Sequence, residues 1–94
     1  MKVHLRIEGI APLYKIFNNK KALDFDFPGD TLADFTNALI RKYGPGVKQA
    51  ILDQKGEIDM ELRVVVNQSV HLSYGERMAA PLQDGDTLHL MTVG

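Results

Sequence analysis

The chain has 94 residues, of which 45 % are hydrophobic and 24 % are charged, so it has the size of one domain and the composition of an ordinary globular protein. Its formal net charge of −1 excludes a general electrostatic attraction to nucleic acid or to an anionic membrane. The absence of cysteine excludes disulfides, thiolate catalysis and a persulfide carried on a side chain. No signal-peptide pattern and no apolar run of membrane-spanning length is present, so we expect a cytoplasmic protein.

Two strands are expected near the N-terminus. Apolar and polar residues alternate over residues 2–8 and again over residues 22–27, the pattern of half-buried strands. Pro28-Gly29 ends the second strand, because proline cannot donate to a continuing ladder. The segment between them has the composition of a loop, and we expect its apolar residues to fold back over apolar surface; these are Leu13, Ile16 and Phe17.

A helix is expected after Asp30. Apolar residues recur there at spacings of three and four, which places them on one stripe of a helix: Leu32, Phe35, Leu39 and Tyr43. Thr31 followed three residues later by Asp34 fits a capping box, and Gly44-Pro45-Gly46 ends the helix. A further short helical turn is expected over residues 47–52, followed by an exposed polar connection over residues 53–59.

The second half of the chain is expected to contain three more strands. The β-branched run at residues 62–66 predicts a central strand with both faces covered or nearly so, and residues 70–72 suit a short edge strand. Asp84-Gly85-Asp86 predicts a tight turn into a last strand at residues 87–91, with Leu88 and Leu90 facing inward.

These elements predict one α+β domain over residues 1–94. Residues 74–83 have no periodic pattern and are expected to be irregular, and residues 92–94 are expected to form a flexible C-terminal tail. Strand, strand, helix, strand, short strand and strand imply a mixed sheet of four to five strands with one main helix across one face.

Motifs for side-chain chemistry are weak in this chain. Ser69 and Ser73 do not lie in a nucleophile-elbow sequence, and no glycine-rich phosphate loop follows a strand. His4, His71 and His89 lack the spacing of metal ligands, so no metal site is predicted. His4 and His89 would be neighbours only if the first and last strands pair.

The outward face of the middle strands is the more promising surface. The alternation predicts a mixed basic and apolar patch there, which includes His4 and Arg6 in addition to four candidate partner-binding residues: Arg63, Val65, His89 and Met91. Exposed apolar side chains among cations are typical of a docking surface for another protein. The alternative is a sheet face with scattered side chains and no partner.

Several segments, taken in order, resemble the ubiquitin-like sulfur carriers of the MoaD and ThiS family, which have the β-grasp fold. The resemblance covers nearly the whole chain. Its matching features are Val3-x-Leu5, the helix start from Pro28 to Phe35, Leu39 with Tyr43, the run Val64-Val65-Val66-Asn67, and Leu82-Gln83-Asp84-Gly85-Asp86-Thr87 before the last strand.

The resemblance implies that the chemistry takes place at the C-terminal carboxylate of Gly94, with Thr92 and Val93 as the tail that presents it. In this family an activating enzyme adenylates the terminal glycine with ATP, and a persulfide donor converts it to a thiocarboxylate. For MoaD-like members, the carrier is the small subunit of molybdopterin synthase, and the sulfur acceptor is the pterin precursor of molybdopterin, in complex with the large subunit. The resemblance therefore implies no catalytic side chain in the carrier itself. Together with the net charge and the histidine spacing, we expect no bound cofactor or metal and no nucleic-acid or membrane partner.

One position departs from the family pattern. The family ends in two glycines, whereas Val93 precedes Gly94 here. Three explanations stay open: the sequence lacks a last glycine, the carrier works with one glycine, or the domain has become a noncovalent subunit of a partner enzyme. A ThiS-like carrier for thiamine thiazole synthesis and a modifier conjugated to lysines through Gly94 also remain alternatives, although the long segment between the first two strands favours the MoaD-like role.

Overall fold

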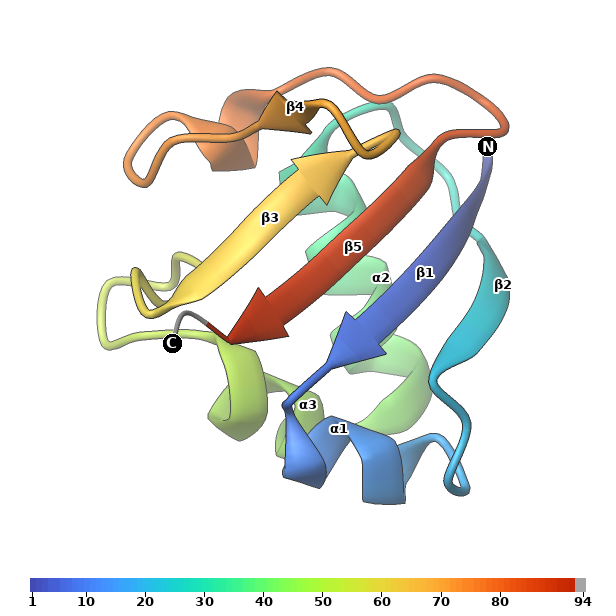
Figure 1. Cartoon of the computed structure of the whole chain (residues 1–94), viewed down its shortest axis with the longest axis vertical. Helices are drawn as coiled ribbons and strands as arrows, with labels where there is room; N and C mark the ends of the chain where they lie inside the picture. The colour runs from blue at the N-terminus through green and yellow to red at the C-terminus, as the bar shows by residue number, and fades with distance from the viewer. Residues whose placement is uncertain (93–94) are drawn as a thin grey trace.

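Five strands form one mixed sheet in the computed structural model, which describes residues 1–92 (Figure 1). The strands are β1 (Lys2–Glu8), β2 (Ala22–Asp26), β3 (Leu62–Val66), β4 (Val70–His71) and β5 (Thr87–Thr92). They lie in the order β2-β1-β5-β3-β4, and only β1 and β5 run parallel to each other. The last strand of the chain therefore lies in the middle of the sheet.

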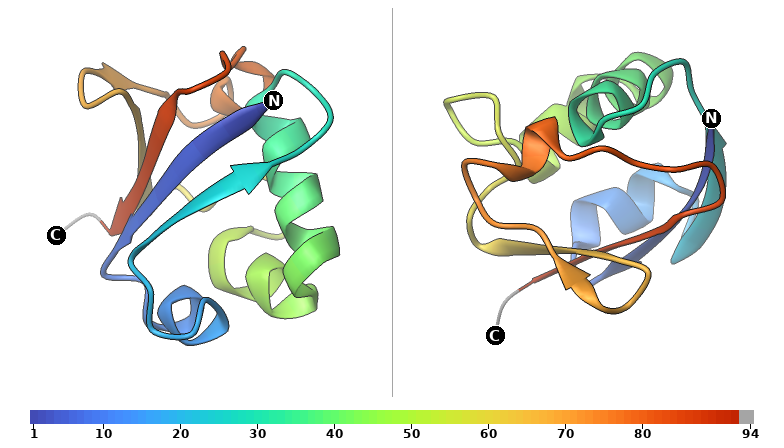
Figure 2. Two further views of the ribbon diagram at one scale, coloured as in Figure 1. Left: turned by 90° about the vertical axis from the view of Figure 1, so that its right-hand side faces the viewer. Right: turned by 90° about the horizontal axis from the view of Figure 1, so that it is seen from above.

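The helices lie on one side of this sheet (Figure 2). They are α1 (Ala11–Ile16), α2 (Leu32–Tyr43), α3 (Pro45–Ile51) and the short 3₁₀ helix η1 (Arg77–Ala79). The expected fold class, an α+β sheet with one main helix across one face, is thus confirmed. Within residues 1–92, no helix is both long and apolar enough to cross a bilayer.

The hydrophobic core lies between the sheet and α2. The inward residues expected from the alternation are buried, except that Leu23 and Val66 are only partly covered. Phe35 of α2 is completely buried and meets Phe25 and Phe27 edge to face, with ring centroids 5.6 Å apart in both pairs. Such aromatic pairs stabilise a core beyond their buried area, so they fix α2 against β2.

The predicted capping box at the start of α2 is confirmed. Thr31 Oγ1 accepts a hydrogen bond from the Asp34 N–H at 3.2 Å, and Asp34 Oδ2 accepts from the N–H groups of Asp30 and Thr31 at 3.0 and 3.2 Å. The Asp30 N–H contributes most, followed by the Thr31 groups, and together they lower the pKa of Asp34. Gly44 ends the helix with φ +93°, a left-handed conformation that favours glycine.

The segment expected to be a loop after β1 forms the helix α1 instead. Gly9, with φ +77°, turns the chain out of β1, and Pro12 stands in the first turn of α1, where its missing N–H has no cost. Leu13 is completely buried beneath the helix. The pattern was missed because a helix of this length spans less than two full turns and shows little periodicity.

The segment from Tyr74 to Gln83 is more ordered than its sequence indicates. Arg77 is only 3 % exposed, and its guanidinium donates to the backbone carbonyls of Leu62 at 2.8 Å, of Asp59 at 2.6 Å, and of Ile58. Burial of the guanidinium lowers the pKa of Arg77. This side chain therefore ties η1 to the connection that precedes β3.

The same connection also contradicts the expected exposed polar character of residues 53–59. Ile58 is completely buried and forms a β-bridge with Leu52. Asp53 accepts hydrogen bonds from the Tyr74 hydroxyl at 2.5 Å and from the N–H groups of Lys55 and Glu57. The Tyr74 hydroxyl contributes most to lowering the pKa of Asp53, and the same hydrogen bond is the main cause that raises the pKa of Tyr74 to about 12.

The capping box gives a first prediction. Thr31→Ala removes the side-chain acceptor for the Asp34 N–H and should lower the free energy of unfolding by about 1 kcal/mol. Urea denaturation followed by circular dichroism measures this loss. Thr31→Ser keeps the acceptor and should retain most of the stability; equal stability of the alanine variant and the wild type would contradict the role of the cap.

The Asp53–Tyr74 pair gives a second prediction, for the pH dependence of stability. Tyr74 has a raised pKa in the folded state, so its contribution is complete below its ordinary value of 10.0 and is lost as the pH rises through about 12. Asp53 has a lowered pKa, so its contribution is present above its ordinary value of 3.8 and is lost as the pH falls through the folded-state value.

Tyr74→Phe should therefore weaken both the alkaline and the acidic loss of stability. The measurement is the urea midpoint across the pH range, compared with Tyr43→Phe as the matched tyrosine control. Identical pH profiles for the Tyr74 variant and the wild type would show that this hydrogen bond does not stabilise the fold.

Candidate functional site

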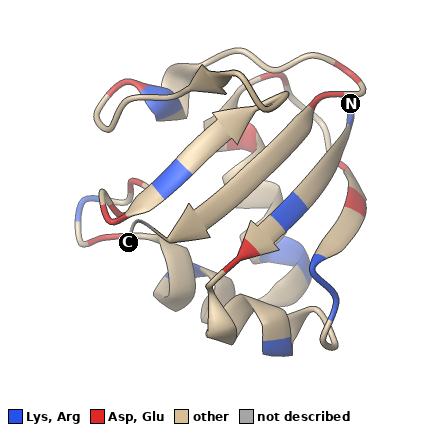
Figure 3. Ribbon diagram, viewed as in Figure 1, with Lys and Arg blue, Asp and Glu red and all other residues tan. Residues whose placement is uncertain are grey.

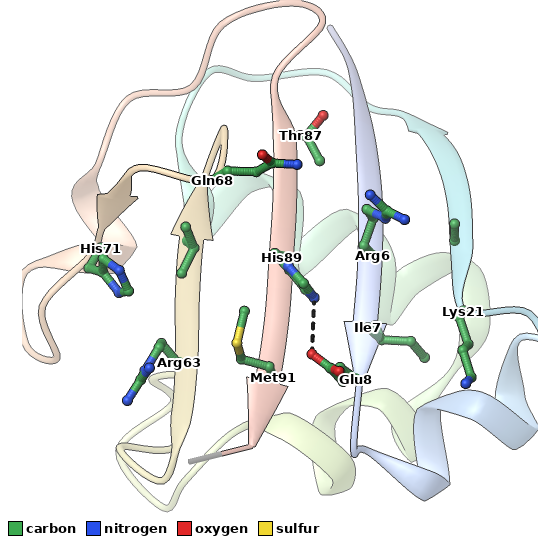
Figure 4. A pocket seen from close by; sticks show the side chains of 12 residues that line it. Arg6, Ile7, Glu8, Lys21, Arg63, Gln68, His71, Thr87, His89 and Met91 are labelled. Atoms are coloured by element: carbon green, nitrogen blue, oxygen red, sulfur yellow. Dashed lines mark ion pairs between the residues drawn. The ribbon is translucent and has the colours of Figure 1, made fainter. Parts of the chain in front are cut away.

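The face of the sheet opposite the helices carries a shallow groove of about 470 Å³ (Figure 4). We call it the sheet groove. Side chains from β1, β3 and β5 form its floor, and the β3–β4 turn, β4 and the residues before β2 form its rim. The residues of most interest here are Arg6, Glu8, Arg63, Val65, His89 and Met91.

Strand register brings the four predicted partner-binding residues together. His89 of β5 lies opposite Val65 of β3, and Met91 lies opposite Arg63. Because successive side chains alternate between the two faces of a strand, all four point away from α2 and into the sheet groove. Their expected clustering on one face is therefore observed, whereas their role in partner binding stays a prediction.

Two members of the predicted patch behave differently from the expectation. Val65 is only 4 % exposed, because β5 and β4 flank it, so it forms the floor of the groove and offers little free apolar surface. His4 lies outside the sheet groove, and its Nδ1 is 2.5 Å from Asp24 Oδ1 on β2. His4 is also not opposite His89, because β1 pairs His4 with Thr87.

The sheet groove is predominantly basic. Arg6 and Arg63 lie on either side of β5, and Lys21 extends the positive charge beyond β1 (Figure 3). Glu8 is the one carboxylate among the residues that line the groove, and its Oε2 lies 3.6 Å from His89 Nε2. A surface of this kind attracts negatively charged groups.

The sequence pattern did not identify several residues of the groove. Glu8 is absent from the predicted patch, because its position in the groove depends on the β1–β5 register that places it beside Met91. Lys21, Gln68 and His71 come from a loop, a turn and an edge strand that fold over the sheet from both sides. Only the strand order places them together, although outward alternation in residues 2–8 was a signal for Glu8.

The histidines do not form a metal centre. His4 contacts Asp24, and His89 contacts Glu8. Within residues 1–92, no group of three or more His, Cys, Asp or Glu side chains is arranged to hold a metal ion.

The end of β5 corrects the expected tail. Thr92 belongs to the strand and pairs with Leu62 at the start of β3, so the predicted tail 92–94 loses its first residue. The alternation around Leu88 and Leu90 predicts a strand that ends at residue 91. Leu62 of β3 provides a pairing position for Thr92, which extends the strand by one residue. Val93 and Gly94 lie outside the described residues.

Gly9 gives a third prediction, for the position of Thr92. A Cβ added at Gly9 would clash with Thr92 Oγ1, whereas a Cβ added at Gly56, which has a similar φ of +80°, would meet no atom within 4 Å. Gly56→Ala should therefore cost about 1 kcal/mol through backbone strain alone, and Gly9→Ala should cost more because Thr92 must move.

Urea denaturation measures the two losses, and amide hydrogen exchange at Thr92 and Leu62 reports the end of β5. Gly9→Ala should accelerate exchange at these two amides, and Gly56→Ala should not. Equal effects of the two substitutions would show that the contact with Thr92 is unimportant.

No protein-family model and no curated protein matches this sequence. Solved structures match its fold over almost the whole chain. Mycobacterium tuberculosis CysO, described as an antigen, is 20 % identical with a TM-score of 0.78, covering 98 % of this chain and 99 % of that one. The Amycolatopsis orientalis BexX/CysO complex contains a chain that is 18 % identical with a TM-score of 0.76, covering 98 % and 96 %.

Haloferax volcanii small archaeal modifier protein 1 is 23 % identical to this chain with a TM-score of 0.67, and the match covers 99 % of this chain and 98 % of that one. Low identity combined with full-length coverage in both directions demonstrates a shared architecture. The chain has the ubiquitin-like β-grasp fold.

Proposed function

We propose that this protein is a sulfur carrier whose Gly94 carboxylate is activated and converted to a thiocarboxylate. The observation that carries the proposal is the full-length β-grasp fold in a chain whose sequence motifs resemble those of the MoaD and ThiS carriers. An activating enzyme would join the carboxylate to AMP from ATP with release of pyrophosphate. The outer sulfur of a persulfide donor would then displace AMP and form an acyl disulfide. A thiol would cleave the sulfur–sulfur bond of this intermediate by forming a new disulfide with the donor sulfur, and the thiocarboxylate would be released.

The position of β5 supports this role. Strand β5 is paired with β1 and β3 on its two sides up to Met91, and β3 alone pairs with Thr92, two residues before Gly94. An extended chain spans at most about 3.3–3.6 Å per residue, so the Gly94 carbonyl stays within roughly 7 Å of Thr92. An enzyme that acts on Gly94 must therefore contact the body of the domain close to the end of β5.

The sheet groove is the surface on which we place that contact. Met91 and Arg63 line it immediately before the strand ends, and Val65 and His89 continue it along β3 and β5. These four residues would bind the activating enzyme and, in turn, the sulfur acceptor. A CysO chain of the same fold has been solved in a complex with BexX, which supports a role for this chain in binding a partner protein.

Molybdopterin is the acceptor pathway that we favour. The long segment between β1 and β2 led to the MoaD-like assignment, with the large subunit of molybdopterin synthase as the partner. A ThiS-like role in thiazole synthesis uses the same Gly94 chemistry and differs only in the acceptor.

A second candidate is a protein modifier attached to lysines through Gly94. The likeness to small archaeal modifier protein 1 favours it. A peptide remnant of this chain on lysines of other proteins, found by mass spectrometry of the source cells, would support the modifier. If no such remnant is found and Gly94 carries a thiocarboxylate, sulfur transfer without protein modification is the supported function.

The fourth prediction concerns Gly94. Protein isolated from its own source should show the mass of a chain with one oxygen replaced by sulfur, located in the C-terminal peptide. Gly94→Ala should abolish or strongly reduce this product, because the added methyl group restricts the approach to the carbonyl. Gly56→Ala, a matched glycine change outside the site, should retain it.

Val93 provides the complementary test of the departure from the family pattern. Val93→Gly should increase the rate of thiocarboxylate formation, because the β-branched side chain stiffens the approach to Gly94. An unmodified carboxylate in protein recovered with a bound partner would contradict sulfur transfer and favour the noncovalent subunit.

A further inference from the structure

Within residues 1–92, the Lys and Arg side chains of the sheet groove form no salt bridge. The salt bridges within residues 1–92 join the N-terminus to Asp26, His4 to Asp24, and His89 to Glu8. Arg6, Lys21 and Arg63 form none, and all three are exposed. Since the whole chain has a net charge of −1, this positive surface is a local feature.

Two other cations, Lys42 and Arg77, contact groups of the protein itself. Lys42 Nζ lies 5.5 Å from the ring centroids of both Phe25 and Tyr43, and the Arg77 guanidinium binds backbone carbonyls. Arg6 and Arg63 have no such role. Their charge is available to an external group.

An apolar pocket adjoins the basic groove. It has a volume of about 270 Å³ and shares Ile7, Glu8 and Lys21 with the sheet groove. The remaining wall comes from the β1–α1 junction and α1 itself: Gly9, Ile10, Ala11 and Tyr14. We call it the α1 pocket. Its volume exceeds that of a cavity of about 150 Å³ that holds benzene, so it can take one large side chain.

The spacing of the cations indicates the kind of ligand. Arg63 on β3 and Arg6 on β1 are separated by β5, which corresponds to about 10 Å between the two strands. Lys21 lies beyond β1 on the side of β2. An extended peptide with several carboxylates has the length to contact all three positions.

We propose that the sheet groove and the α1 pocket together bind an extended acidic segment of a partner protein, with one large apolar side chain seated in the α1 pocket. This inference rests on the proposed docking role of the groove and adds the chemistry of the partner. Val65 and Met91 form an apolar floor between the cations, as expected for a protein ligand with both kinds of side chain.

The position of the α1 pocket connects this binding to Gly94. Glu8, which both cavities share, pairs with Met91, one residue before the end of β5. A segment that crosses the groove from Arg63 toward Lys21 therefore passes close to the C-terminal end of the central strand β5. It would hold the partner within the short reach of the two residues that follow Thr92.

The fifth prediction tests the inference by nuclear magnetic resonance on the full ¹⁵N-labelled chain. The probe is a short synthetic peptide with glutamates at alternate positions and a leucine at one end. Its addition should shift amide signals of the groove and of α1 and leave those of α2 unchanged. The Arg6→Glu, Arg63→Glu double variant should weaken binding by about tenfold or more.

Matched controls separate each part of the proposal. Arg41→Glu reverses an exposed charge on α2, on the other side of the sheet, and should leave binding unchanged. A peptide with serine in place of leucine should lose the shifts of α1 and keep those of the groove. Added salt should weaken binding of the original peptide.

Several results would overturn the proposal. These are the absence of shifts in the groove, equal binding of a lysine version of the peptide, equal weakening by Arg41→Glu, and stronger binding of a short oligonucleotide at the same amides. Signal changes at the groove with protein concentration alone would instead assign this face to a second copy of the chain.

A chain lacking Gly94 keeps this test independent of sulfur transfer. It should bind the peptide as the wild type does, although it cannot form the Gly94 thiocarboxylate. If neither the wild type nor the truncated chain binds the peptide, the proposal of an acidic ligand is wrong. If Gly94 is unmodified in the source protein, the proposed carrier function is wrong.

Discussion

The parallel pairing of β1 with β5 is the contact on which the rest of the structure depends. It joins residues 4–8 to residues 87–91, and the His4 N–H donates to the Asp86 carbonyl at 2.8 Å just before the ladder begins. Closing so long a loop has a large entropic cost, which burial of Leu5, Ile7, Leu88 and Leu90 between the sheet and the helices offsets. The pairing also places β5 between β1 and β3, so it creates the sheet groove and positions the strand that leads to Gly94.

Local patterns predicted those parts of the fold that local chemistry determines. The period of two in β1 and the capping box of α2 each involve neighbours in sequence, and both predictions are confirmed. The helix α1 is too short to show a clear period, and the burial of Arg77 depends on distant groups. An arginine normally remains exposed, and Arg77 is buried because the turns before β3 direct the carbonyls of Ile58, Asp59 and Leu62 toward it.

The same distinction explains the site. Alternation identified Arg63, Val65, His89 and Met91 as outward residues, since each strand sets its own faces. Alternation says nothing of register, and register decides that His89 lies beside Arg6 and not beside His4. The low exposure of Val65 likewise depends on β4, a two-residue strand whose placement follows the β3–β4 turn. The pattern therefore found the face and missed the rim formed by Lys21 and His71.

In the sulfur carrier that we propose, the reactive carboxyl of Gly94 and the recognition surface on the sheet are separate, and the distance between them would limit how the protein works. Only Val93 lies between Thr92 and Gly94, so a partner that acts on Gly94 would also contact the sheet. The β-branched Val93 in place of glycine makes that link stiffer and bulkier. A stiffer link loses less conformational freedom on binding, but it restricts the directions from which an active site can approach the carbonyl. Docking through the basic groove would fix one direction of approach to the Gly94 carbonyl. The choice of partner would then depend on the folded body of the domain.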